Sequence, residues 1–426
     1  MKLFIILSLI SYLVTFFLVT IVPFKNIYFF NSFYLFTILS ILWLYWYKTY
    51  NKRSIIVAYN KIKEFPIIIL LFLLILYAYF MRWSIEPHGM GDATVLWSGK
   101  ASVIANLYLQ NIDFSLNNLI WKFPNYPIAL PFILSGFSIM IGSYNYLIPI
   151  IYTIISTFIF IYIIITQSVV HKGKYNRFIF VLLISIMFLD KNYIFVQSDL
   201  CADYPLSIFV GIYCYLFLRR HRKNSYFYMG CTFAIMSSLK NEGILLSLVF
   251  IFILIIYKFN GDKVNLTSIF TAYLLFFLPM IIYKLNFTII PKDFESNEGL
   301  LSKIVNKNPK IFLNELLIIS KYFIEYQFGF QKGILLFFSY FLIVYGDKKQ
   351  KALLTFYWLL VLIYSFIFLN YSSDVEKHLL GAYNRINVHI YPILFVALFY
   401  NINILQDRII EIIHNINLES KNSNPD

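Results

Sequence analysis

The chain has 426 residues, of which 60% are hydrophobic, 20% aromatic and only 13% charged. Soluble globular domains carry about 25% charged residues, so this composition excludes an ordinary soluble protein and indicates one that crosses a membrane several times. The formal net charge of +14 would suggest nucleic-acid binding in a soluble protein. In a membrane protein, basic residues instead mark cytoplasmic connections, and no nucleic-acid partner is expected.

Long apolar runs recur from one end of the chain to the other. They are about 17 to 23 residues long, the length that a helix needs to cross roughly 30 Å of hydrocarbon. We therefore expect an all-α polytopic membrane protein of about twelve transmembrane helices, forming a single transmembrane domain over residues 1–426. The expected spans are 3–23, 27–47, 66–83, 146–168, 178–190, 204–218, 226–240, 243–257, 267–285, 329–345, 352–369 and 387–404. The N-terminal run lacks a small-residue cleavage site and should remain as the first helix.

Basic segments set the expected topology. They cover residues 48–63, 171–177, 219–223, 258–263 and 348–351. Placing all of them in the cytoplasm puts both termini there and leaves two large outer loops, 84–145 and 286–328. The apolar stretch 127–142 then has to be an interfacial or re-entrant helix on the outer side. The stretch 311–326 is expected to lie in the membrane interface, unless it is part of an ordinary span.

A polar segment interrupts the apolar pattern at residues 86–100, which read Glu-Pro-His-Gly-Met-Gly-Asp-Ala-Thr-Val-Leu-Trp-Ser-Gly-Lys. Asp92 stands directly before an expected helix, 93–110. Its ordinary role would be an N-cap whose carboxylate accepts hydrogen bonds from backbone N–H groups. The flexible Gly89-Met-Gly91 before it, and Lys100 two turns after it, favour instead a loop that presents an acid and a base to one cleft.

Three further places bring polar residues to the expected outer face. Asp199 and Asp203 are four residues apart, so on one helical face they could hold a divalent cation or a sugar hydroxyl; interfacial capping is the alternative. Lys240 and Glu242 stand between two expected spans that are joined by almost no loop. Charged side chains at membrane depth cost free energy and usually mark a functional site; the alternative is that these two only neutralise each other. Arg385 suits a phosphate held by two hydrogen bonds, with snorkelling to the interface as the alternative.

Three cysteines, Cys201, Cys214 and Cys231, are scattered without metal-type spacing or a disulfide framework. We expect them to be packing residues.

The order of these motifs resembles that of bacterial membrane glycosyltransferases of the C-type (GT-C) fold. The resemblance rests on Pro87-x-Gly-x-Gly-Asp-Ala-x-x-x-Trp-x-x-Lys-Ala101, Pro124-Asn-Tyr-Pro127, Ala202-Asp-Tyr-Pro205, Lys240-Asn-Glu-Gly243, and Arg385 shortly before Pro392. It implies a GT-C-like core over 66–257 with outer-loop interfacial helices, and a catalytic outer loop at 84–145. An extra N-terminal hairpin, 1–47, precedes the core, and C-terminal helices, 267–404, follow it.

The resemblance also implies a reaction and roles for individual residues. Such enzymes move a sugar from a polyprenyl-phosphate donor to a hydroxyl acceptor, here by a single inverting displacement. Asp92 would be the general base, with Glu86 as a second catalytic acid residue. Lys100, Lys240 and Arg385 would stabilise the leaving phosphate. The remaining candidate substrate-binding residues are His88, Trp97, Tyr126, Asp199, Asp203, Asn241, Glu242 and His389.

The expected partners are the polyprenyl-phosphate sugar, a glycan, lipid or protein acceptor, and membrane lipids. No cofactor is assigned; a divalent cation, Mg²⁺ or Mn²⁺, stays open. The expected location is the bacterial inner membrane, with the active site facing the periplasm or exterior. A lipid-linked-glycan transporter or flippase, and a polysaccharide polymerase or ligase, are the alternative functions. Ionisable residues gathered at one outer face, rather than at mid-membrane, favour the transferase over the transporter.

Overall fold

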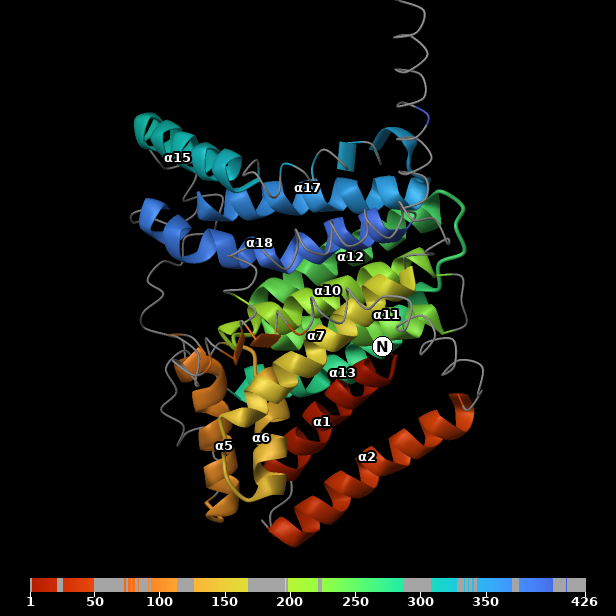
Figure 1. Ribbon diagram of the computed structural model, residues 1–426, viewed down its shortest axis with the longest axis vertical. Helices are drawn as coiled ribbons and strands as arrows, with labels where there is room; N and C mark the ends of the chain where they lie inside the picture. The colour runs from red at the N-terminus through yellow and green to blue at the C-terminus, as the bar shows by residue number, and fades with distance from the viewer. Residues whose placement is uncertain are drawn as a thin grey trace, which may run out of the picture. The chain divides into compact units, whose positions relative to one another are not determined.

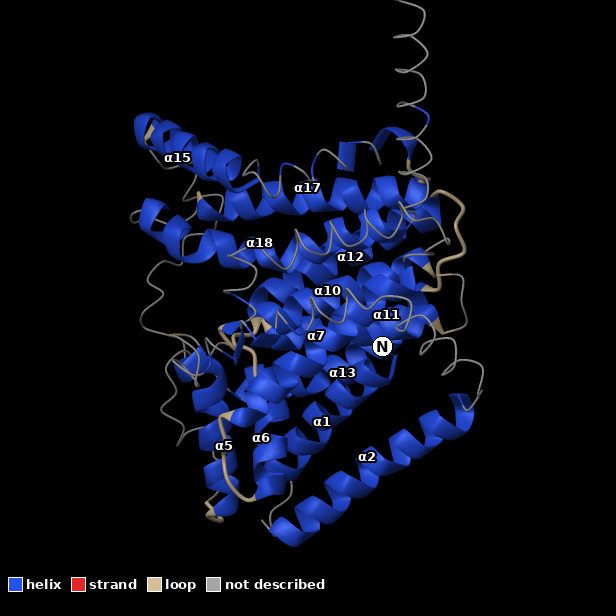
Figure 2. Cartoon of the chain, in the orientation of Figure 1, coloured by secondary structure: helices blue, strands red, loops and turns tan. Residues whose placement is uncertain are grey.

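In the computed structural model of the chain, the described residues form helices joined by loops and include no strand (Figures 1 and 2). These residues are 2–20, 26–49, 73, 76–77, 79–80, 83, 91, 93–112, 126–167, 196, 198–220, 224–286, 308–327, 333, 336, 339–340, 343–369, 375–400 and 411. Continuous apolar runs without β-type alternation give helices because each helix satisfies its own backbone hydrogen bonds.

The chain divides into two compact units. Unit 1 comprises residues 1–160 and 194–295, and unit 2 comprises 161–193 and 296–426. Unit 1 contains α1 (Lys2–Thr20), α2 (Ile27–Thr49), η1 (Ala93–Ser98), α5 (Gly99–Leu109), α6 (Ala129–Ile141), most of α7 (Leu147–Gln167), α10 (Asp203–Leu218), α11 (Ser225–Leu239), α12 (Asn241–Phe259) and α13 (Leu266–Asn286). Unit 2 contains α15 (Pro309–Gln327), α17 (Lys348–Phe368) and α18 (Val375–Tyr400).

Helix α11 lies at the centre of unit 1 and packs against α10, α12 and α13. Its closest neighbour is α13, because Gly230 carries no Cβ at the crossing. A Cβ there would collide with the backbone carbonyl of Ile269 and the side chain of Ala272. Small residues that let two backbones approach are typical of helix packing in membranes, where dispersion contacts replace the hydrophobic effect.

At each end of unit 1, the contacts join segments that the basic residues predict to lie on the same side of the membrane. At one end Arg220, just after α10, forms an ion pair of 2.6 Å with Asp262, just after α12. Lys2, at the start of α1, lies over a tyrosine ring near the start of α11. At the opposite end of α10, Asp203 meets Lys240, between α11 and α12. Segments expected on the same side of a membrane therefore lie at the same end of the unit.

The N-terminal helices belong to this same packed unit. Helix α1 packs against α2, α6 and α11, and the hydroxyls of Ser11 and Tyr34 join α1 to α2 by a buried hydrogen bond of 2.5 Å. Helix α6 has 13 residues, so it is only about 20 Å long. That length fits the interfacial or re-entrant helix expected over 127–142 better than a span.

In unit 2, α17 packs along α18, and α15 packs on both. A capping box starts α17, in which Asp347 Oδ1 accepts from the Gln350 backbone N–H at 2.8 Å and Gln350 Oε1 accepts from the Asp347 backbone N–H at 3.1 Å. The buried core where α15 meets the other two helices includes Ile319, Phe368 and Tyr383. A helix over 311–326 is thereby confirmed as α15, and its place in a membrane stays a prediction.

Among the described residues, four helices are long and apolar enough to cross a membrane. They are Lys2–Thr20, Asn241–Phe259, Leu266–Asn286 and Lys348–Phe368. Helices α2, α7, α10, α11 and the second half of α18 lie where further spans are expected. The expected spans 66–83, 178–190 and 329–345 fall largely outside the described residues. The structure thus supports a helical membrane protein, and the number of about twelve spans remains a prediction.

Candidate functional site

Of the polar segment 86–100, the structure describes only Gly91 and residues 93–100. Glu86, His88 and Asp92 lie outside the described residues, whereas Gly91 has φ of 45°, a left-handed conformation that suits glycine. The expected helix 93–110 is confirmed, but its first turns form the π-helix η1 before α5 continues. Such π-helical turns occur frequently at functional sites, and they follow directly on the proposed general base.

Lys100 lies in the first turn of α5 with only 3% of its surface exposed. Burial, together with the positive charge of Lys284, lowers the pKa of Lys100 to about 7. Trp97, one turn earlier, is buried and its ring meets that of Tyr126 edge-on at 6.0 Å between centroids. Three residues predicted from the sequence, Lys100, Trp97 and Tyr126, therefore belong to one packed region of unit 1.

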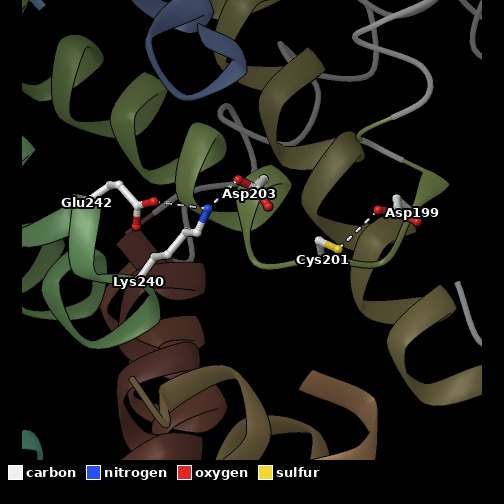
Figure 3. A network of polar contacts seen from close by, with 5 residues as sticks. All are labelled: Asp199, Cys201, Asp203, Lys240 and Glu242. Carbon is white, nitrogen blue, oxygen red and sulfur yellow. Dashed lines mark hydrogen bonds and ion pairs between the residues drawn. The ribbon is translucent and has the colours of Figure 1, made fainter. Parts of the chain in front are cut away.

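The clearest polar network joins three charged residues from α10, α11 and α12 (Figure 3). The ammonium of Lys240 donates to Asp203 Oδ1 at 2.6 Å and lies 3.4 Å from Glu242 Oε1. The side chains of Lys240 and Asp203 are 5% and 0% exposed, whereas that of Glu242 is 28% exposed. A buried ammonium needs such partners, because an uncompensated charge is strongly destabilising in a low-dielectric interior.

The local backbone explains why Lys240 is held there. Lys240 is extended, with φ of −155° and ψ of 152°, and is the single residue between α11 and α12. Gly243 permits this tight hairpin, because a Cβ at that position would collide with the backbone carbonyl of Met236 on α11. Asn241 begins α12 and is exposed. The Lys240-Asn-Glu-Gly243 motif is thus a sharp helix–helix turn that fixes a cation between two carboxylates.

Asp199 is placed differently from the expectation. The prediction that Asp199 and Asp203 share one helical face is wrong, since α10 begins at Asp203 and Asp199 lies in the turn before it. Leu200, with φ of 58°, reverses the chain between them. The Asp199 carboxylate instead accepts from the Cys201 thiol at 3.1 Å, and Figure 3 shows Asp199 on the far side of Cys201 from Lys240. The carboxylates of Asp199 and Asp203 are therefore not placed to bind one ligand together.

Cys201, Cys214 and Cys231 are buried and none of them forms a disulfide, in agreement with the expected packing role. Within the described residues, no group of three or more histidine, cysteine or acidic side chains is close enough to hold a metal ion. The carboxylates of Asp203 and Glu242 both contact the ammonium of Lys240.

Two of the predicted site residues, Arg385 and His389, belong to α18 in unit 2. They are four residues apart on one helix and so share a face. His389 is fully buried and its ring meets that of Tyr364 on α17 edge-on, at 6.2 Å between centroids. Their roles toward a substrate stay predictions.

Lys284 is a residue that the sequence reasoning missed. It lies in the last turn of α13, where its charge acts on Lys100, 184 positions earlier in the chain. One feature of the sequence could have drawn attention to it. Lys284 stands at the expected outer end of a span, whereas lysines in membrane proteins are more frequent on the cytoplasmic side.

Together these features define the class of the molecule: the described part of the chain is helical, with four helices long and apolar enough to cross a membrane, and unit 1 holds a buried network of Asp203, Lys240 and Glu242. Comparison of the chain with protein-family models, with curated proteins and with solved structures finds no match.

Proposed function

We propose that this chain is an integral membrane glycosyltransferase of the GT-C type. It would transfer a sugar from a polyprenyl-phosphate donor to a hydroxyl acceptor at the extracytoplasmic face of the bacterial inner membrane, with both termini in the cytoplasm. The observation that carries the proposal is the convergence of Asp203, Lys240 and Glu242, from two segments of the motif order, at one end of a helical unit. Ionisable residues within a membrane protein mark functional sites by default.

In the proposed reaction, Asp92 takes the proton from the acceptor hydroxyl as its oxygen attacks the anomeric carbon. The bond between that carbon and the phosphate oxygen breaks, and the bonding electrons leave with the polyprenyl phosphate. The displacement inverts the anomeric configuration. The leaving phosphate gains one negative charge, so cationic groups that are already in place stabilise it without reorganisation.

The contacts divide the cations of this site into two kinds. Lys240 is engaged by two carboxylates, so we assign it to positioning: it holds the ends of α10, α11 and α12 in one arrangement. Lys100 is assigned to the phosphate, and Arg385, in unit 2, keeps the phosphate role that the resemblance implies for it. His88, Trp97, Tyr126, Asn241 and His389 remain proposed contacts to the sugar or the acceptor, as do Asp199 and the exposed side of Glu242.

A transfer assay tests the proposal. Membranes containing the chain are incubated with a panel of polyprenyl-phosphate sugars, and release of polyprenyl phosphate is measured together with the anomeric configuration of the product by NMR. We expect one donor to be consumed, an inverted product, and loss of both signals in the Asp92→Asn variant. Repeating the assay with a chelator, then restoring Mg²⁺ or Mn²⁺, decides whether a cation is required.

Two outcomes would replace the proposal with an alternative. Movement of an intact lipid-linked glycan across the bilayer, without release of polyprenyl phosphate, would identify a flippase. Consumption of only polyprenyl-pyrophosphate-linked glycans, with release of the pyrophosphate, would identify a polymerase or ligase.

A further inference from the structure

The end of unit 1 opposite to the network of Lys240 is strongly basic. It is formed by the start of α1, the end of α10, the start of α11 and the turn between α12 and α13. The ion pair of Arg220 with Asp262, and the contact of Lys2 with a tyrosine ring of α11, join these segments. Their described residues include one acidic side chain, Asp262, and several basic ones: Lys2, Arg219, Arg220, Lys258 and Lys263. This end of the unit therefore carries an excess of positive charge.

The carboxylate of Asp262 is engaged by a buried arginine. Arg220 is only 3% exposed, and its guanidinium lies over the rings of Phe217 and Tyr257, at 5.0 and 4.6 Å from their centroids. Its Nη2 donates to Asp262 Oδ2 at 2.6 Å. Because a buried guanidinium needs such a counter-charge, Asp262 offsets Arg220, and the other cations at this end of the unit remain in excess.

Hydrogen bonds hold the turn between α12 and α13 in one conformation. The Gly261 backbone N–H donates to the Lys258 carbonyl at 3.1 Å, and Gly261 has φ of 89°. A left-handed glycine directly after the last turn is a common way to end a helix. The Tyr226 hydroxyl donates to the Lys263 carbonyl at 2.6 Å, which joins the turn to α11. The backbone that carries Lys258 and Lys263 is therefore fixed at both ends of the turn.

The side chains of this turn combine charge with apolar surface. Lys258 and Lys263 are exposed, and neither forms an ion pair with a residue that the structure describes. Phe259, which follows Lys258 directly, is 86% exposed. Exposed lysines beside an aromatic ring are typical of a segment at a membrane surface, where the ring enters the headgroup region and the ammonium groups stay in water. Basic residues there attract anionic lipids.

We propose that the turn of residues 258–263 binds the headgroup of an anionic phospholipid in the leaflet that faces this end of unit 1. The ammonium groups of Lys258 and Lys263 attract the lipid phosphate, and the Phe259 ring lies against the apolar part of the lipid. A soluble anion offers no surface for Phe259 to contact, so the charge and the ring together favour a lipid. The proposal does not depend on sugar transfer, in which none of these residues is assigned a part.

Fluorescence quenching at one position tests the proposal on the full chain in nanodiscs. The reporter is a bimane on a cysteine introduced at Asn260, an exposed residue directly after α12; the native thiols are buried. The quencher is phosphatidylglycerol with brominated acyl chains, and phosphatidylcholine with the same chains is the uncharged comparison. The host bilayer is zwitterionic. The mole fraction of each brominated lipid that gives half-maximal quenching is measured.

We expect phosphatidylglycerol to quench at a mole fraction roughly 25-fold lower than phosphatidylcholine, because each basic residue at an anionic lipid contributes about 1 kcal/mol, or about fivefold. Lys258→Gln or Lys263→Gln should reduce this preference to about fivefold, and the double glutamine variant should abolish it. The double arginine variant should retain it. The matched control, Lys310→Gln with Lys321→Gln, removes the same charge from exposed positions of α15 and should keep the preference.

Equal quenching by the two lipids in the wild type would overturn the proposal, as would a preference that survives in the double glutamine variant. Displacement of the lipid by soluble glycerol phosphate at constant ionic strength would identify a free anion as the occupant instead. High salt should weaken the preference, because exposed charges are screened; an unchanged preference would contradict its electrostatic basis. Thermal unfolding in phospholipid-free detergent should be the same in every variant, since the substituted lysines are exposed.

Discussion

At the scale of single residues, Asp92 separates two interpretations of the polar segment. Asn caps a helix about as well as Asp, so Asp92→Asn should leave expression and thermal stability nearly unchanged. An amide cannot take up the acceptor's proton, so the transfer rate should fall by roughly 10² to 10⁴. The comparison uses single-turnover transfer and thermal unfolding in the same preparation. A wild-type rate in Asp92→Asn, with destabilisation in Asp92→Ala, would make the residue a cap.

Variants of the buried pair Lys240 and Asp203 can likewise distinguish a role in stability from a role in sugar transfer. Removing one partner of a buried ion pair costs about 3 to 5 kcal/mol, so Asp203→Asn should lower the unfolding temperature markedly. The double variant Asp203→Leu with Lys240→Met restores an apolar contact and should recover most of that stability. Thermal unfolding and sugar transfer are measured on each variant.

The activity of that double variant decides the role of the pair. We expect a folded protein that transfers sugar poorly, because the end of α10 is no longer fixed against the α11–α12 turn. A folded and fully active double variant would show that the pair only neutralises itself. Lys258→Gln is the control: Lys258 is exposed in the last turn of α12, so this change should stay within about 0.5 kcal/mol.

At the scale of elements, the tight turn between α11 and α12 depends on a glycine. Gly243 lies against the Met236 carbonyl without room for a Cβ, so Gly243→Ala should force the two helices apart. We expect a loss of about 2 kcal/mol or more, which is larger than usual for a surface change. Asn241→Ala, two residues earlier and exposed, is the control and should stay within about 0.5 kcal/mol. Equal effects in denaturant unfolding would contradict this account of the turn.

Helix positions were predictable from the sequence, and side-chain partners were not. The bounds of α7, α10, α11, α12 and α13 agree with the expected spans to within a few residues, because apolar length alone sets them. The pairing of Lys240 with Asp203, and the action of Lys284 on Lys100, depend on which helices pack together. Leu200 has a left-handed backbone conformation, and Asp199 lies before it, outside α10. The pattern of apolar residues does not indicate such a turn.

At the scale of the whole molecule, the expected topology follows from charge bias and awaits a direct test. Cysteines introduced at Ser84, Asn192 and Ser373 should react with an impermeant thiol reagent in intact spheroplasts, because these positions fall in expected outer connections. Cysteines at Asn51 and Asn224 should react only after permeabilisation. Labelling of the second set alone would invert the topology and move the proposed site to the cytoplasm. The native thiols are buried, so they should contribute little background.

The pairing of Asp203 with Lys240 also constrains how the protein is made. During synthesis the Asp203 carboxylate reaches the membrane 37 residues before its partner. A lone charge at the centre of a helix raises the free energy of insertion by about 2.5 to 3.5 kcal/mol. Asp203 stands at the end of α10 and therefore bears a smaller part of that cost, which the 16 residues of α10 have to offset until Lys240 arrives. Helix α10 should therefore wait at the insertion machinery until the α11–α12 hairpin delivers Lys240, and the three helices should enter the bilayer together.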